Sequence, residues 1–133
     1  MISNHEIDAY VANDPYISAM YGGTLAIDEL PKYEITQPTL YIVNTDPAHM
    51  PGEHWLSLLV GGNVLNEHFD SIGNLPLPEV RNFLNNQSKI SPYKGYYVYN
   101  HIRVQSVVSV TCGLFSLMYA YYRSRNVSFA SFL

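Results

Sequence analysis

The stretch HWLSLLVGGNVLNEHFD, residues 54–70, constrains the fold of this chain more than any other. Two runs rich in apolar residues flank the turn-forming residues 61–63, a pattern that predicts two antiparallel strands joined by a tight turn. If 61–63 form the whole loop, the register places His54 directly opposite Asp70. Directly opposed side chains on one face have Cβ atoms about 4.5–5.5 Å apart. The hairpin therefore predicts an imidazole–carboxylate pair, which a register slip of one residue would break.

The only cysteine, Cys112, stands where a β-branched run gives way to helical spacing of apolar residues from Gly113 onward. A thiol at a helix N-terminus meets unpaired backbone N–H groups and the positive end of the helix dipole. Both stabilise the thiolate, which is the nucleophilic form. A lone cysteine in apolar surroundings is more often a small buried side chain. The predicted imidazole–carboxylate pair favours catalysis, because a carboxylate can orient an imidazole that activates the thiol.

Further signals predict a small α+β domain. Ser3 and Glu6 have the spacing of a capping box, which indicates a first helix over about 4–11. The other expected elements are a glycine-bearing loop at 21–31, a buried strand at 39–45, a helix at 77–87, a strand at 96–104 and the helix from Gly113. The 133 residues contain no repeat or linker, which predicts one domain, 1–133. We expect one mixed or antiparallel sheet that carries the hairpin and packs against helices on both sides.

The cysteine count and the histidine spacing argue against a metal or disulfide site. One thiol cannot close an internal disulfide or build a multi-cysteine zinc site. No His-x-x-x-His or Cys-x-x-Cys spacing occurs, so we expect no metal and no cofactor. The histidines other than His54 are interpreted as surface or structural residues, and the second of the hairpin is expected to face away from it: these are His5, His49, His68 and His101.

Charge is divided unevenly along the chain. Residues 1–70 carry a net charge of −9 and residues 71–133 a net charge of +5, which gives −4 overall. An acidic chain argues against tight, nonspecific binding of nucleic acid. No apolar run reaches the roughly 18 residues that a membrane-spanning helix needs, and the N-terminal segment lacks a secretory signal. These features predict a soluble intracellular protein without membrane contact.

A glutamine in the sequence QSVVSVTCGLFSLMYA (105–120) adds a further candidate. Gln105 lies seven residues before Cys112, at the expected end of a strand. Its side-chain amide could donate a hydrogen bond to a developing oxyanion, with the backbone N–H of Cys112 as the second donor. A glutamine in a loop is usually solvated, so this role depends on a catalytic thiol.

Four sequence segments together resemble the adenovirus maturation protease family, the adenains. They are GEHW (52–55), EHFDSIG (67–73) with its acid, the glutamine at 105, and the Cys-Gly helix start at 112–113. The family's order of histidine, acid, glutamine and cysteine is kept. YIVNT before the histidine and YGGTLAIDELP near the N-terminus are also similar to this family and to its relatives in virophages and large DNA transposons. The family is distantly similar to the proteases that process ubiquitin-like proteins.

The resemblance implies a cysteine endopeptidase that cuts viral capsid precursors during particle maturation, at small-residue or Gly-Gly sites. Cys112 would be the nucleophile, His54 the general base and Asp70 the residue that orients it. Gln105 would be the oxyanion donor. The side chain beside the histidine and the glycine after the cysteine would contact the substrate: these are Trp55 and Gly113. The protease would act in the virion and at the site of virus assembly inside the host cell, without being secreted.

The sequence departs from the adenovirus enzyme in three ways. That enzyme has Glu where this chain has Asp70, which is chemically adequate. Its activating peptide is tethered by a disulfide, which a chain with one cysteine cannot form, so any activating peptide here would be untethered. Its DNA cofactor binds a basic surface, which leaves DNA a weakly supported partner of this acidic chain.

Two alternatives remain open from the sequence. One is a protease that removes ubiquitin or a similar modifier from host proteins, because both kinds of substrate can present Gly-Gly. The other is a noncatalytic domain in which a surface rich in the 12 tyrosines binds a peptide. In that second case Cys112 would only be a buried side chain.

Overall fold

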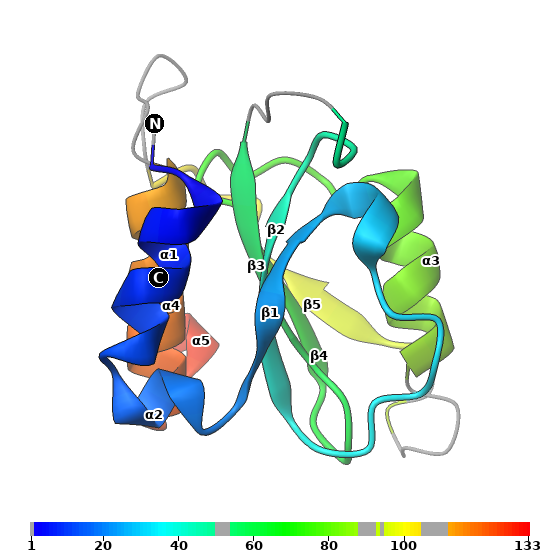
Figure 1. The fold of residues 1–133 in the computed structure, drawn as a ribbon. Coiled ribbons are helices and arrows are strands. Elements are labelled where there is room, and N and C mark those ends of the chain that lie inside the picture. Colours follow the sequence, from blue (N-terminus) through cyan, green and yellow to red (C-terminus); the bar gives the residue numbers. More distant parts are fainter. Residues whose placement is uncertain (1, 50–53, 88–92, 94, 105–111) are drawn as a thin grey trace.

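The computed structural model describes residues 2–49, 54–87, 93, 95–104 and 112–133, which form a five-stranded sheet with helices on both faces (Figure 1). The strands lie side by side in chain order: β1 (Tyr21–Ala26), β2 (Thr39–Asn44), β3 (Trp55–Val60), β4 (Asn66–Phe69) and β5 (Tyr97–Tyr99). The two central pairs are antiparallel, whereas β1 joins β2 and β5 joins β4 in parallel. The predicted α+β fold with one mixed sheet between helices is confirmed.

Two apolar layers hold the helices to the sheet. One face packs against α1 (Asn4–Ala12), α2 (Pro15–Ser18), α4 (Cys112–Ser124) and α5 (Phe129–Phe132). The other face packs against α3 (Pro78–Gln87) and the 3₁₀ turn η1 (Ile27–Glu29). Because β3 is buried on both faces, its residues alternate between the layers. Leu59 contacts the α4 layer, and Leu58 contacts the α3 layer.

The hairpin register differs from the prediction by two residues. A loop of 61–63 would pair Leu59 with residue 65, but Leu59 pairs with Glu67. The loop is longer because β4 begins only at Asn66, whose side-chain oxygen accepts the Gly61 N–H at 3.3 Å. A shift of two residues leaves each side chain on its expected face. The expectation that His54 lies directly opposite Asp70 in the ladder is therefore wrong, although the two side chains do meet.

The segment 21–31, expected to be a loop, instead forms β1 and η1. Its glycines allow close packing against the neighbouring strand. A Cβ atom at Gly22 would lie 2.2 Å from the Tyr41 ring, so only glycine fits this edge of the sheet. Glycine content alone therefore misassigned a strand as a loop.

The remaining elements agree with the sequence in type and differ at their ends. The capping box of α1 is confirmed, with Ser3 N–H to Glu6 Oε1 and Glu6 N–H to Ser3 Oγ both at 3.1 Å. The strand expected at 96–104 is limited to Tyr97–Tyr99. The last long helix, α4, includes Cys112 as its first residue. The short helices α2 and α5 have no counterpart among the predicted elements.

A buried ion pair joins α4 to β4. Arg123 donates from Nε to Glu67 Oε1 and from Nη2 to Glu67 Oε2, both at 2.8 Å. The buried Tyr119 hydroxyl donates to Glu67 Oε1 at 2.6 Å. Such bidentate pairs fix orientation as well as distance. The pair therefore sets how the helix that begins at Cys112 lies on the strand that leads to Asp70.

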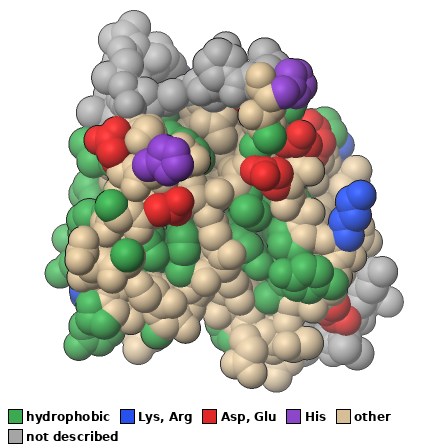
Figure 2. Space-filling model, viewed as in Figure 1, with side chains coloured by type: hydrophobic (Ala, Val, Ile, Leu, Met, Phe, Trp, Pro, Cys, Tyr) green, Lys and Arg blue, Asp and Glu red, His purple; other side chains and the backbone are tan. Residues whose placement is uncertain are grey.

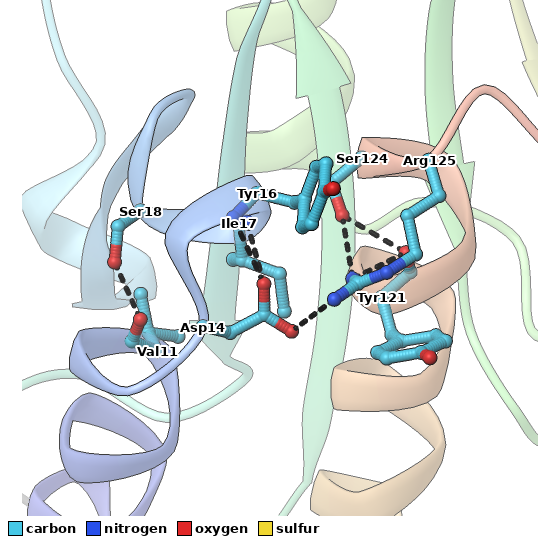
Figure 3. Close-up of polar contacts among 8 residues, drawn as sticks. All are labelled: Val11, Asp14, Tyr16, Ile17, Ser18, Tyr121, Ser124 and Arg125. Atoms are coloured by element: carbon cyan, nitrogen blue, oxygen red, sulfur yellow. Dashed lines mark hydrogen bonds and ion pairs between the residues drawn. The ribbon is translucent and has the colours of Figure 1, made fainter.

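A second ion pair joins α2 to the end of α4 (Figure 3). Arg125 Nη2 donates to Asp14 Oδ2 at 3.0 Å, and the guanidinium lies over the Tyr16 and Tyr121 rings, 4.6 and 3.6 Å from their centroids. Asp14 Oδ1 also caps α2 by accepting the backbone N–H groups of Tyr16 and Ile17. One carboxylate thus starts a helix and holds it against α4.

The charged side chains on one face of the molecule are mostly acidic (Figure 2). Acidic side chains gather on the face that carries α1, β1 and η1, whereas Lys and Arg side chains are scarce there (Figure 2). Across the residues that the structure describes, no helix has the length and apolar character needed to cross a membrane.

Breaking the Glu67–Arg123 pair is expected to destabilise the fold. Glu67→Gln leaves the guanidinium without a counter-charge in a largely buried position, which should lower the free energy of unfolding by about 3 kcal/mol. Urea unfolding of the variant and the parent measures the difference. Exposed Glu34 provides the matched control, since Glu34→Gln removes the same charge and should change stability by less than about 0.5 kcal/mol. Equal effects of the two substitutions would contradict a structural role for the pair.

Candidate active site

Cys112 is the first residue of α4 and lies against the start of β3. Its side chain is buried with 3% exposure, and its Sγ accepts the backbone N–H of Trp55 at 3.4 Å. The backbone N–H of Gly113, in the first turn of the helix, also stabilises the thiolate. The predicted position of the thiol at a helix N-terminus is confirmed.

His54 and Asp70 meet at the adjacent ends of two antiparallel strands. His54 immediately precedes β3, and its carbonyl accepts the Thr45 N–H at 2.8 Å, which fixes its backbone. Asp70 immediately follows β4 and is 3% exposed. Nε2 of the imidazole lies 2.6 Å from Asp70 Oδ1. The imidazole also lies close enough to Cys112 for the ring and the thiol to shift each other's pKa, so the ring interacts with both the carboxylate and the thiol.

The three groups shift one another's protonation. Burial alone disfavours the imidazolium, but the hydrogen bond to Asp70 and the interaction with Cys112 outweigh it and raise the pKa of His54 to about 9. Burial likewise opposes the charged forms of the other two groups. Interaction with the nearby His54 nevertheless lowers the pKa of Asp70 and of the Cys112 thiol. The arrangement favours a thiolate–imidazolium pair, which can attack an electrophilic carbon and then deliver a proton.

Asn100 fixes the backbone of Asp70 and was not found from the sequence. Its Oδ1 accepts the Asp70 N–H at 2.9 Å, and its Nδ2 donates to the carbonyls of Asp70 at 2.6 Å and Ile102 at 3.1 Å. The residue is 2% exposed. Oδ1 of Asp70 also accepts the Ile72 N–H at 2.9 Å, so the carboxylate is held by its own turn while Asn100 holds the backbone of the same residue. A polar residue that ends a short strand carries no periodic signal in sequence.

The other predicted site residues lie beside the thiol or outside the described part of the chain. Trp55 is 5% exposed, and its indole Nε1–H donates to the Ile2 carbonyl at 3.0 Å. Gly113 is buried next to it, since a Cβ atom at this glycine would lie 3.1 Å from Trp55 Cδ1. Gln105 falls outside the described residues.

His68 is buried, which agrees with a structural role rather than a surface position. The expectation that it faces away from His54 is wrong, because it shares strand parity with Asp70 and its charge interacts with both Asp70 and His54. It pairs with Leu58 of β3 and therefore belongs to the α3 face of the sheet, away from Cys112. It is 1% exposed, and neither ring nitrogen has a hydrogen-bond partner among the described residues. Burial lowers the pKa of His68 to about 4, which keeps the ring neutral near pH 7. Within the described residues no group of three His, Cys, Asp or Glu side chains could hold a metal ion.

The fold matches solved structures of proteases. Two structures of the ASFV pS273R protease are similar: one is 28% identical with a TM-score of 0.54, covering 72% of this chain and 39% of that chain. The other is 21% identical with a TM-score of 0.63, covering 99% and 60%. The C-terminal domain of the Ulp1 protease, in complex with Smt3, the yeast ortholog of SUMO, is 16% identical with a TM-score of 0.59 and coverages of 96% and 67%.

These comparisons establish the fold shared by the ASFV protease and Ulp1, a protease with a catalytic cysteine. No family model and no curated protein matches the chain. The chain spans 39% and 60% of the two ASFV chains. The more specific resemblance to the adenains stays a prediction.

The contact between His54 and Cys112 predicts how thiol reactivity depends on pH. The alkylation rate of Cys112 by iodoacetamide should rise with a midpoint below the value of about 8.5 for a free thiol. In His54→Ala the midpoint should move upward, because burial then acts without the imidazole. Exposed His49 supplies the control, and His49→Ala should keep the parent midpoint. An unshifted midpoint in His54→Ala would contradict the coupling.

Truncation of the Asn100 side chain should remove two hydrogen bonds to the Asp70 backbone. Asn100→Ala leaves the buried N–H and carbonyl of Asp70 without this partner, which should lower the free energy of unfolding by about 2–3 kcal/mol. Asn100→Asp should not rescue stability, because a carboxylate oxygen would then face the carbonyls that Nδ2 contacts now. Denaturant unfolding measures both, and Asn82→Ala on the exposed face of α3 should be nearly neutral. Full rescue by Asp would show that the amide donor is unimportant.

Proposed function

We propose that this chain is a cysteine endopeptidase in which Cys112 attacks, His54 transfers protons and Asp70 orients the imidazole. The single observation that carries the proposal is the hydrogen bond of His54 to Asp70 Oδ1 at 2.6 Å, next to a thiol at the start of α4 whose pKa the imidazole lowers. The hairpin of β3 and β4 and the sequence-distant helix α4 place these groups together. The similarity of the fold to proteases supports the same activity.

The proposed reaction is acyl transfer through a thioester. The thiolate of Cys112 attacks the carbonyl carbon of the scissile peptide bond and forms a tetrahedral oxyanion. The backbone N–H of Cys112 and the side-chain amide of Gln105 donate hydrogen bonds to that oxyanion. The imidazolium of His54 then protonates the leaving amine, and the C–N bond breaks. Water, deprotonated by His54, hydrolyses the thioester and regenerates the thiol.

The proposed substrate is a viral precursor polypeptide, cut at small-residue or Gly-Gly sites during particle maturation. The similarity to a viral protease at 28% identity supports this choice over a modifier protease, since the Ulp1 likeness is 16% identical. Ulp1 in complex with Smt3 supports the general inference of a polypeptide substrate and keeps the modifier alternative testable. The same proposal places the protein at the site of virus assembly and in the virion.

The substrate class can be tested by a pair of reporters. One is a flexible peptide with an internal Gly-Gly site, and the other is the same Gly-Gly at the C-terminus of a folded ubiquitin-like fusion. We expect a kcat/KM at least about tenfold higher for the flexible peptide, because a maturation protease must accept extended segments. A preference for the folded modifier would favour the alternative function.

Active-site variants separate catalysis from mere peptide binding. Cys112→Ala should abolish cleavage, Gln105→Ala should lower kcat by about 10²–10³, and Asp70→Asn by up to about 10⁴. Activity should also fall above pH about 9, where His54 loses its proton. A Cys112→Ala variant that keeps all function would establish a noncatalytic domain instead.

A further inference from the structure

The N-terminal segment before α1 fills a slot beside the thiol. The slot lies between the Trp55 indole and the bare Cα of Gly113. The indole Nε1–H donates to the Ile2 carbonyl at 3.0 Å. A Cβ atom built at Gly113 would lie 1.9 Å from Ile2 Cγ2, so the Ile2 side chain occupies the space that the glycine leaves.

The walls of this slot are the nearest neighbours of the thiol. Gly113 follows Cys112 in α4, and the backbone N–H of Trp55 donates to Cys112 Sγ at 3.4 Å. In this conformation the thiol is 3% exposed and Trp55 is 5% exposed. The residues that line the slot therefore border the sulfur that the proposed reaction uses, and whatever occupies the slot lies next to it.

Ile2 makes the contacts that an extended peptide would make. Its carbonyl accepts a hydrogen bond from a side-chain donor, and its aliphatic side chain packs on a glycine. Ser3, the N-cap of α1, has extended backbone angles (φ −87°, ψ 165°), so the segment enters the helix from an extended conformation. The helix is capped by Ser3 and Glu6 independently of the Ile2 side chain. Ile2 can thus leave the slot without uncapping α1.

We propose that the slot between Trp55 and Gly113 is a peptide-binding subsite that Ile2 occupies in the free protein and that substrate must displace. The subsite takes a backbone carbonyl on the indole N–H and a small or aliphatic side chain against the glycine. Its role as a substrate subsite rests on the proposed endopeptidase function. The occupancy of the slot by Ile2 rests on the contacts alone.

A competing segment reduces apparent affinity by the fraction of molecules in which the slot is filled. Ile2→Ala removes the side chain that packs on Gly113 but keeps the backbone and the helix cap. The slot should then be open more often. We expect a KM about three- to tenfold lower with kcat unchanged, since each tenfold change requires only about 1.4 kcal/mol. The iodoacetamide rate of Cys112 should rise with an unchanged pH midpoint, because the contacts of the imidazole are untouched.

The sole tryptophan of the chain gives a readout that needs no activity. Trp55 emission should shift to longer wavelength and become more accessible to iodide quenching in Ile2→Ala. Gly113→Ala provides a second variant, because its Cβ must expel Ile2 from the slot and should change the fluorescence in the same direction. Leu75→Ala, an aliphatic truncation at a side chain that is 67% exposed, is the matched control and should leave emission, alkylation and KM at parent values.

The outcomes distinguish this inference from the proposed function. Red-shifted emission, faster alkylation and a lower KM in Ile2→Ala support occupancy by a displaceable segment. Unchanged emission and alkylation, or a higher KM, would overturn it and make Ile2 a fixed wall of the cleft. If no peptide is cleaved and the thiol midpoint ignores His54, the endopeptidase function fails. The fluorescence of the two variants still decides whether Ile2 fills the slot.

Discussion

The hydrogen bond between His54 and Asp70 is the interaction around which the site is built. Its 2.6 Å length joins two side chains that are shielded from solvent, so little water competes for either group. In such surroundings an opposite charge at contact distance strongly favours the ionised forms. The Ile72 N–H binds the carboxylate and Asn100 binds the Asp70 backbone, which together limit how far the carboxylate can move toward another partner.

The position of the thiol relative to this pair depends on how α4 is attached to the sheet. The helix begins at Cys112. Near its other end, Arg123 forms a bidentate ion pair with Glu67, which lies three residues before Asp70 in the chain. A helix held at one end by a bidentate ion pair and along its length by an apolar layer has little freedom to slide. The Arg125–Asp14 contact adds a second attachment at the same end. The geometry at Cys112 is thus a consequence of contacts remote from it.

The residues of the candidate site were predicted from the sequence more accurately than the strand register that positions them. The apolar run of β3 and the helical spacing after Cys112 depend only on local sequence, and both elements form as predicted. The hairpin register failed because it depended on loop length, which the Asn66 side chain decides through its bond to Gly61. The contact survived because strand parity is insensitive to a shift of two residues.

Other features could not be derived because their signals are not periodic. The glycines of β1 indicated a loop, whereas close approach to Tyr41 requires them in a strand. Asn100 acts through its side-chain amide on the backbone of Asp70, a contact that joins two separate strand ends. Ile2 lies outside any element, and only the three-dimensional fold brings it over Gly113. Long-range polar contacts and segments outside regular elements therefore mark the limit of what sequence patterns predict here.

The neutral state of His68 explains why the Asp70 carboxylate interacts as an ion pair with His54 and not with both histidines. Its imidazole lies close enough to Asp70 for their charges to interact, yet burial keeps its pKa near 4. A protonated His68 would attract the same carboxylate that holds His54 and would repel the imidazolium of His54. A neutral ring avoids both effects, although its nitrogens have no hydrogen-bond partner among the described residues. The apolar α3 face thus leaves the Asp70 charge to act on His54, and through it on the thiol.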